Sequence, residues 1–93
     1  MREKAIEQKF VAAVKAAGGL ALKFTSPGFD GVPDRIALLP GGKMVFVEVK
    51  APGEKPRPLQ LARHRLLRRL GFKVYVLDDE SQIGGMIDEI QSA

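Results

Sequence analysis

The stretch that most constrains the fold is residues 44–50 (MVFVEVK), which are apolar on both faces of an extended strand until one glutamate. Alternate side chains of a strand point to opposite faces, so three valines share one face and the other carries Met44, Phe46, Glu48 and Lys50. A strand of this kind is central and covered on both sides, which predicts an α/β fold. A buried carboxylate is costly unless it is paired or bound to a cation, so Glu48 requires a partner.

The rest of the sequence supplies the other elements of such a fold. Apolar residues at helical spacing predict helices over residues 3–17 and 59–70, and Ser81 is placed to cap a last helix. The apolar stripe of the second helix is Leu59, Ala62, Leu66, Leu67 and Leu70, and that of the last helix is Ile83, Met86, Ile87 and Ile90. Short apolar runs predict further strands over residues 20–24, 34–39 and 73–77.

The connections between these elements predict the topology. Pro40-Gly41-Gly42-Lys43 has the composition of a tight hairpin connection, so residues 34–39 and 44–50 should pair antiparallel. The helix over residues 59–70 is long enough to return the chain to a parallel neighbour. We therefore predict one domain over residues 1–93, with a mixed four-stranded sheet and flanking helices in the order αβββαβα.

Composition excludes several classes of protein. There is no cysteine, so neither a disulfide nor a thiolate zinc site holds the fold. The single histidine, His64, excludes sites built on several histidines and is interpreted as a surface residue of its helix. No apolar stretch approaches the roughly 18 residues that span a bilayer, so we expect a soluble, cytoplasmic protein without a membrane partner.

Charge is distributed unevenly within a net charge of +4. Residues 50–75 contain eight lysines and arginines against the single acid Glu54, whereas residues 76–93 contain five acids and no base. A basic segment suits a phosphate backbone, because each neutralised phosphate releases counterions. Solvated helix faces are also rich in arginine, so charge alone leaves nucleic-acid binding and a plain basic surface as equal alternatives.

The polar residues at one end of the predicted hairpin form a second signal. The hairpin register brings Asp34, at the start of one strand, to the same end as Glu48 on the next. Two carboxylates beside Lys50 suit Mg²⁺, which binds through a few carboxylate oxygens and keeps several waters. Such a site serves phosphoryl chemistry. The alternatives are a strand-end salt bridge between Glu48 and Lys50 and a turn role for Asp34.

These residues resemble a known nuclease signature. Gly31-Val32-Pro33-Asp34, the hairpin, and Glu48-Val49-Lys50 resemble the PD-(D/E)xK motif, and Ser26-Pro27-Gly28 with Gln60 resembles the compact VRR-NUC branch. The resemblance covers about residues 3–77 and implies a restriction-endonuclease-like fold.

The resemblance implies a role for each matching residue. Asp34 and Glu48 would be metal ligands together with the backbone carbonyl of Val49, and Lys50 would align the attacking water. Gln60 would lie near the active site, although a plain first-turn role in its helix is the alternative. A first-helix acid would point at the site; Glu7 is preferred over Glu3, four residues away on the same side. Candidates for holding phosphates are Lys23, Ser26, Lys55, Arg57 and Arg63.

The function implied is that of a Mg²⁺- or Mn²⁺-dependent endonuclease that hydrolyses DNA phosphodiester bonds. Stand-alone members of the family resemble resolvases, which implies branched or Holliday-junction DNA, a homodimer, and a place in DNA repair or recombination in a bacterial or phage-infected cell. The alternatives are a catalytically inert DNA-binding module with the same fold, which would lack an acid or the lysine, and a structural subunit with an acidic docking tail.

Overall fold

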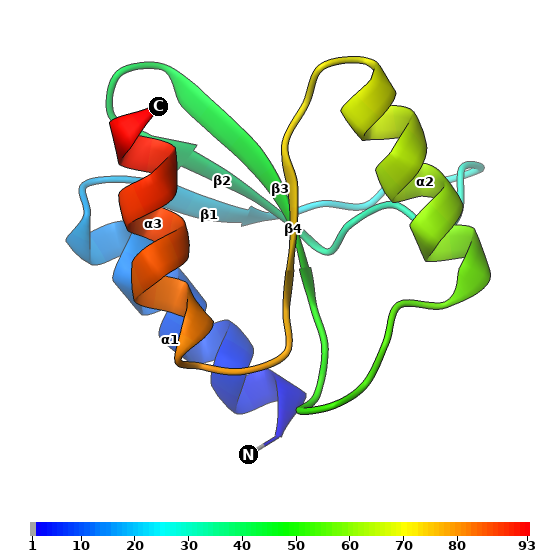
Figure 1. Ribbon diagram of the computed structural model, residues 1–93, viewed down its shortest axis with the longest axis horizontal. Coiled ribbons are helices and arrows are strands. Elements are labelled where there is room, and N and C mark those ends of the chain that lie inside the picture. The colour runs from blue at the N-terminus through cyan, green and yellow to red at the C-terminus, as the bar shows by residue number, and fades with distance from the viewer. Residues whose placement is uncertain (1) are drawn as a thin grey trace.

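A four-stranded sheet in the order β1-β2-β3-β4 runs through the middle of the protein, with helices on both faces (Figure 1). The computed structural model describes residues 2–93. The strands are β1 (Leu20–Lys23), β2 (Arg35–Leu39), β3 (Lys43–Val49) and β4 (Val74–Leu77). The helices are α1 (Glu3–Ala16), α2 (Pro58–Arg69) and α3 (Gln82–Ser92). The predicted fold class and the order αβββαβα are confirmed.

The hairpin between β2 and β3 sets the register of the sheet. The two strands pair antiparallel from Arg35 opposite Val47 to Leu39 opposite Lys43. Because Lys43 already pairs, the connection is one residue shorter than predicted, and Gly41 and Gly42 both adopt positive φ (+88° and +73°) within it. Strand β4 pairs parallel to β3, and α2 is the crossover between them, so the mixed sheet is confirmed.

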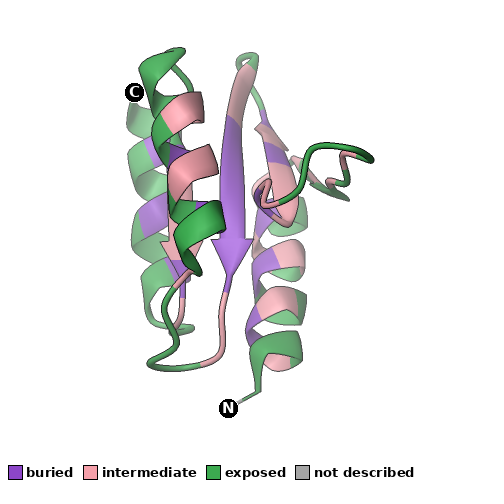
Figure 2. Cartoon of the chain, turned by 90° about the vertical axis from the view of Figure 1, so that its right-hand side faces the viewer, coloured by how far each residue is buried: buried purple, intermediate pink, exposed green. Residues whose placement is uncertain are grey.

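Helices α1 and α3 cover one face of the sheet, and the main core lies beneath them (Figure 1). The three valines of β3 point into this core, and β3 is buried along most of its length (Figure 2). Their helix partners are Ile6, Phe10, Val14, Ile83, Met86, Ile87 and Ile90. The apolar stripes read from the sequence for these two helices therefore face the sheet.

Helix α2 covers the other face, but with a polar side rather than its predicted apolar stripe. Leu59 and Leu70 are 46% and 64% exposed, whereas Gln60 and His64 are the buried residues of α2. The prediction for this helix face is wrong because Glu48 lies buried under α2 and takes hydrogen-bonding partners from it.

Further apolar residues share this face of the sheet outside α2. Phe46 packs between Phe24 and Phe72, with ring centroids 5.6 and 5.8 Å away. Directly paired residues lie on one face, so Leu22, opposite Ile36 in the register, also lies on this side. Leu22 is 43% exposed, so this half of the sheet is only partly covered.

The ends of several elements differ from the sequence prediction. Asp34 precedes β2 and Lys50 follows β3, so both lie just beyond paired strand. Ser81 occupies the N-cap position of α3, but its hydroxyl makes no capping hydrogen bond. Asp79 Oδ1 instead accepts the Ser81 N–H at 2.9 Å, so the capping role predicted for Ser81 is wrong. Over residues 2–93, every helix is too short or too polar to cross a bilayer.

Candidate active site

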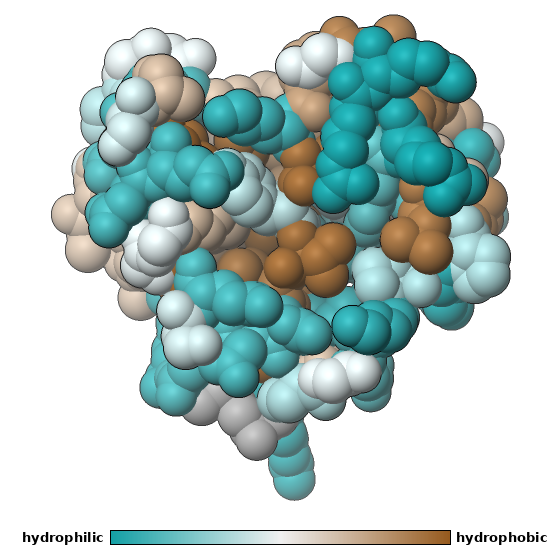
Figure 3. Space-filling model, viewed as in Figure 1, coloured by the Kyte–Doolittle hydropathy of each residue, from teal (hydrophilic) through white to brown (hydrophobic). Residues whose placement is uncertain are grey.

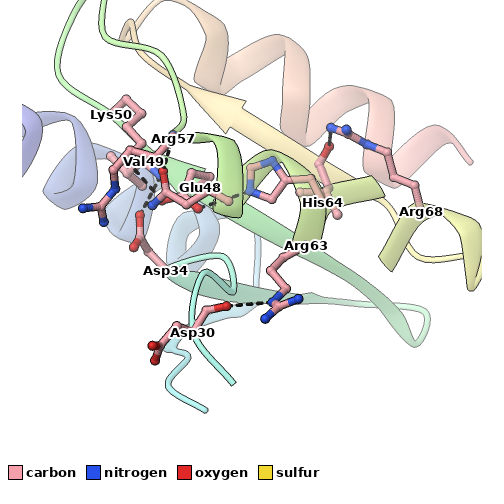
Figure 4. Close-up of polar contacts among 11 residues, drawn as sticks. Asp30, Asp34, Glu48, Val49, Lys50, Arg57, Arg63, His64 and Arg68 are labelled. Carbon is pink, nitrogen blue, oxygen red and sulfur yellow. Dashed lines mark hydrogen bonds and ion pairs between the residues drawn. The ribbon is translucent and has the colours of Figure 1, made fainter. Parts of the chain in front are cut away.

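Glu48 is the centre of a buried polar cluster beneath α2 (Figure 4). The β3 alternation that sends the valines to one face sends Glu48 to the other, where the residue is 0% exposed. Gln60 Nε2 donates to Glu48 Oε2 at 3.3 Å, and His64 Nε2 lies 3.2 Å from Oε1. Lys50 Nζ lies 3.7 Å from Oε2. Each carboxylate oxygen of Glu48 thus has a partner on α2.

Asp34 lies just before β2, at the end of the hairpin away from its turn, beside Glu48. Its Oδ2 accepts the backbone N–H of Val49 at 2.9 Å, and its carbonyl accepts the N–H of Phe24 at 2.8 Å. The N–H and the carbonyl of one strand residue point to the same side, so the Val49 carbonyl also lies on the Asp34 side of β3. The structure therefore brings Asp34, Glu48, Val49 and Lys50 to one end of two adjacent strands, as the register predicted.

The pKa of Glu48 is strongly perturbed in this site. The pKa of Glu48 is raised to about 8, first by burial and then by a hydrogen bond with Asp34 and by the Asp34 charge. The Lys50 ammonium acts in the opposite direction on the pKa of Glu48, and Glu3 adds to the rise. Without a cation, the pair therefore keeps a proton at neutral pH, which is the behaviour expected of two acids that share one site.

His64 belongs to this cluster and is not a surface residue. The side chain is 0% exposed, and burial lowers its pKa, so the imidazole is neutral. The surface prediction was wrong because it did not take into account that the buried Glu48 draws His64 Nε2 to within 3.2 Å of its Oε1. The signal that places it is its spacing from Gln60: residues four apart lie on one side of a helix, and Gln60 was already predicted to be near the site.

Glu7, the preferred first-helix acid, is held by a residue that the sequence reading missed. Arg35 Nε donates to Glu7 Oε2 at 2.8 Å, and Arg35 Nη1 donates to the Ala21 carbonyl at 3.3 Å. Arg35 follows Asp34 directly, so this ion pair ties α1 to the end of β2 that carries the site. Glu3 is exposed and is the first-helix acid whose charge raises the pKa of Glu48.

The residues predicted to hold phosphates lie on four segments: the end of β1, the loop after it, the loop before α2, and α2 itself. Lys23 ends β1 and lines a cleft of about 360 Å³ together with Glu7 and Arg35. Lys55 and Arg57 are exposed in the loop before α2, and Ser26 lies in the loop after β1.

The two arginines predicted to hold phosphates, Arg57 and Arg63, differ in whether other residues already hold their side chains. Arg63 Nε donates to the Asp30 carbonyl at 2.7 Å, and its guanidinium lies 3.8 Å from the centre of the Phe29 ring. Arg63 is therefore engaged in fixing the loop before Asp34. Arg57 lines a cleft of about 540 Å³ with Asp30, Gly31 and Gln60, and its exposed side chain is free to meet a ligand there.

The donor set fits a hard divalent cation with few protein ligands. Within residues 2–93, no three histidine, cysteine or acidic side chains gather as a metal site. The available donors are the carboxylates of Asp34 and Glu48 and the carbonyl of Val49. Mg²⁺ is commonly bound through one or two carboxylates while it retains several waters. Glu48 is fully buried beside a second carboxylate, and a bound cation would offset the charge of both.

Two known proteins are similar to this chain over most of its length. A phage protein named "Putative nuclease p44", from Acyrthosiphon pisum secondary endosymbiont phage 1, is 55% identical over 80 residues, which is 86% of each chain. A solved structure described as a VRR_NUC domain superposes with a TM-score of 0.87 at 31% identity, over 95% of this chain and 97% of that one. No family model matches the chain.

A mixed sheet with two carboxylates and a lysine at the open end of its central hairpin, together with these similarities, defines a nuclease fold. The chain belongs to the VRR-NUC family of nucleases.

Proposed function

We propose that this protein is an endonuclease that hydrolyses DNA phosphodiester bonds with Mg²⁺ or Mn²⁺. The observation that carries the proposal is the pair of adjacent carboxylates, Asp34 and Glu48, with Lys50 Nζ 3.7 Å from Glu48 Oε2. An inert DNA-binding module would have no use for a buried glutamate beside a second acid, because burying that carboxylate is costly to the fold. Membership of a nuclease family supports the same conclusion.

Each residue of the site has a defined task in this proposal. Asp34, Glu48 and the carbonyl of Val49 would hold the cation. When bound, the cation lowers the pKa of a water and neutralises charge on the phosphate. Lys50, fixed just beyond the end of β3, presents its ammonium where it orients the attacking water and meets charge developing on the phosphate oxygens. Glu7 acts through Arg35 on the position of Asp34.

Basic side chains around the site are proposed to hold the DNA backbone. Lys55 and Arg57 project from the loop before α2, and Lys23 approaches from the end of β1. Figure 3 shows hydrophilic side chains gathered over α2. Phosphate contacts of this type position a duplex without reading its sequence, which agrees with a nuclease that recognises the shape of its substrate.

Branched DNA and a homodimer form the finer part of the proposal. Six large apolar side chains within residues 2–93 are more than two fifths exposed, and four of them are Leu20, Leu22, Leu70 and Phe72. Exposed apolar side chains gathered on one face mark a binding surface, and a second copy would cover them and bring a second site. Two symmetry-related sites suit a junction, where two strands must be cut.

The test of the activity is a panel of labelled junction, flap, duplex and single-stranded DNAs with Mg²⁺, Mn²⁺ or EDTA. Cleavage that needs the cation and that favours junctions is expected, with Asp34→Asn and Lys50→Ala inactive. The matched control is Asp88→Asn, an exposed acid of α3 away from the site, which should cut normally. Cutting in EDTA, or full activity of Asp34→Asn, contradicts the mechanism, and binding without cutting in every metal favours the inert module.

The test of the assembly is light scattering of the wild type beside Leu20→Glu. The wild type is expected to have the mass of a dimer and the variant that of a monomer, since Leu20 is 60% exposed on the partly covered half of the sheet. A wild type that stays monomeric at working concentration contradicts the homodimer.

A further inference from the structure

His64 is a buried imidazole whose surroundings point to a task beyond filling space. It reaches from α2 toward the sheet, where its Nε2 lies 3.2 Å from Glu48 Oε1 (Figure 4). Its other ring nitrogen, Nδ1, is buried and has no hydrogen-bond partner among residues 2–93. An apolar residue of similar volume would avoid this unpaired nitrogen, so the contact with Glu48 is the feature that the histidine adds.

Gln60 makes the matching contact one helical turn earlier. Its Oε1 accepts the backbone N–H of Arg57 at 2.8 Å, which fixes the orientation of the amide. Its Nε2 is therefore turned toward Glu48 and donates to Oε2 at 3.3 Å. Residues four apart share one side of a helix, so Gln60 and His64 approach the two oxygens of a single carboxylate from one rigid element.

The unpaired Nδ1 indicates which nitrogen of His64 carries the proton. If Nδ1 carried it, a buried N–H would have no acceptor, and orphaned N–H groups are rarer in proteins than unpaired acceptors. The tautomer with the proton on Nε2 leaves only an acceptor unpaired and lets the ring donate to Glu48. Burial keeps the imidazole neutral, so His64 adds a donor to the site without adding charge.

We propose that Gln60 and His64 form a two-donor clamp on Glu48, in which His64 is a positioning residue that holds the carboxylate in the orientation needed to bind a divalent cation beside Asp34. This inference rests on the proposed function, because the task of the clamp is to prepare Glu48 as a ligand. Hydrogen bonds around a ligand commonly change metal affinity or activity by about 10–100-fold.

The decisive comparison is His64→Leu with His64→Gln. Leucine fills the space without a donor, whereas the glutamine amide offers a donor near the position of Nε2. Mn²⁺ binding followed by calorimetry is expected to weaken by about 10–100-fold in His64→Leu and to stay near the wild type in His64→Gln. The kcat for DNA cleavage should fall in His64→Leu with KM unchanged, because DNA contacts lie elsewhere. Equal losses in both variants, or no loss in His64→Leu, overturn the clamp.

A stability cycle separates failure of the clamp from failure of the proposed function. Unfolding free energies of the wild type, His64→Leu, Glu48→Gln and the double variant are measured without cation or DNA, and the two changes are expected to be non-additive. Additive effects overturn the clamp even if the enzyme cuts DNA. If the two changes are non-additive but the wild type binds no cation, the proposed function is rejected and the clamp stands. Should His64→Leu not fold, Gln60→Met removes the other donor, and unchanged Mn²⁺ affinity in that variant overturns the clamp.

Discussion

Asp34 Oδ2 accepts the backbone N–H of Val49 at 2.9 Å, so the carboxylate that lies beside Glu48 also fixes the end of β3 (Figure 4). Asparagine at position 34 keeps an oxygen that can accept this bond, whereas alanine leaves the N–H unpaired. The free energy of unfolding of Asp34→Ala is therefore expected to be about 1 kcal/mol lower than that of Asp34→Asn. Both variants should be inactive. Urea denaturation beside the cleavage assay checks this, and equal stability of the two variants contradicts the structural role of the bond.

The raised pKa of Glu48 should make the stability of the metal-free protein depend on pH. Its pKa is raised from 4.5 to about 8 in the folded protein, so between these values the folded state binds more protons than the unfolded state and stability falls as pH rises. Between about pH 7 and 9 the loss should be on the order of 1 kcal/mol. The pKa of His64 is lowered in the folded protein from its ordinary value of 6.5, so its own effect is a rise of stability with pH that is almost complete by pH 7.

The measurement is thermal unfolding in EDTA at several pH values, for the wild type and Glu48→Gln. The wild type should lose stability toward high pH more steeply than Glu48→Gln, which has no proton to release. Added Mg²⁺ should stabilise the wild type most at high pH, where the carboxylate is free to bind it. Parallel pH curves for the two proteins would show that Glu48 does not titrate in this range.

The fold was largely predictable because its signals are local. The double-sided apolar pattern of residues 44–50 required cover on both faces, and the Pro-Gly-Gly turn set a register that brought Asp34 to Glu48. These patterns depend on strand and turn geometry alone, which the sequence determines within a few residues. Asp34, Glu48 and Lys50 meet for the same reason.

The parts that failed depend on contacts between distant segments. The leucine stripe of α2 predicted an apolar packing face, yet the helix is rotated so that Gln60 and His64 meet Glu48. Hydrophobic periodicity predicts only which helix face is apolar. It does not predict that a buried carboxylate on another element needs hydrogen-bond donors from the helix. The partner of Glu7 was missed similarly, because Arg35 lies 28 residues away and only the folded sheet brings it to α1.

Lys50 is expected to affect the chemical step far more than the fold. Its ammonium is 3.7 Å from Glu48 Oε2, and its side chain is 12% exposed at the end of β3. Lys50→Ala should lower kcat by about 100-fold or more, because it removes positive charge from the reacting phosphate, and it should leave the melting temperature nearly unchanged. Single-turnover cleavage with Lys15→Ala, an exposed lysine of α1, as control measures this; a loss confined to DNA affinity would make Lys50 a simple phosphate contact.

Substitutions of Glu7 and Glu3, two acids of α1, should differ in their effects on stability and on cleavage. The ion pair of Glu7 with Arg35 is partly buried, so Glu7→Gln should lower the unfolding free energy by about 1 kcal/mol and reduce cleavage less than Asp34→Asn does. Glu3→Gln should leave stability nearly unchanged, because Glu3 is exposed at the helix start. Chemical denaturation and cleavage rates of both variants test this. Inactivity of Glu7→Gln at full stability would assign Glu7 a direct role at the reacting centre.

Arg57 and Arg63 should differ in how they affect DNA binding. Arg57 is exposed beside a cleft. In Arg57→Ala, the slope of log DNA affinity against log salt concentration should therefore become shallower by about the amount that one phosphate contact contributes. The stability of this variant should be unchanged. Arg63 holds the Asp30 carbonyl and stacks on Phe29, so Arg63→Ala should also lower the melting temperature by loosening the loop before Asp34. Salt titrations of DNA binding with metal omitted, together with thermal unfolding, separate the two roles. An unchanged salt slope in Arg57→Ala would place the DNA on another face, and an unchanged melting temperature in Arg63→Ala would leave that arginine free to hold phosphate.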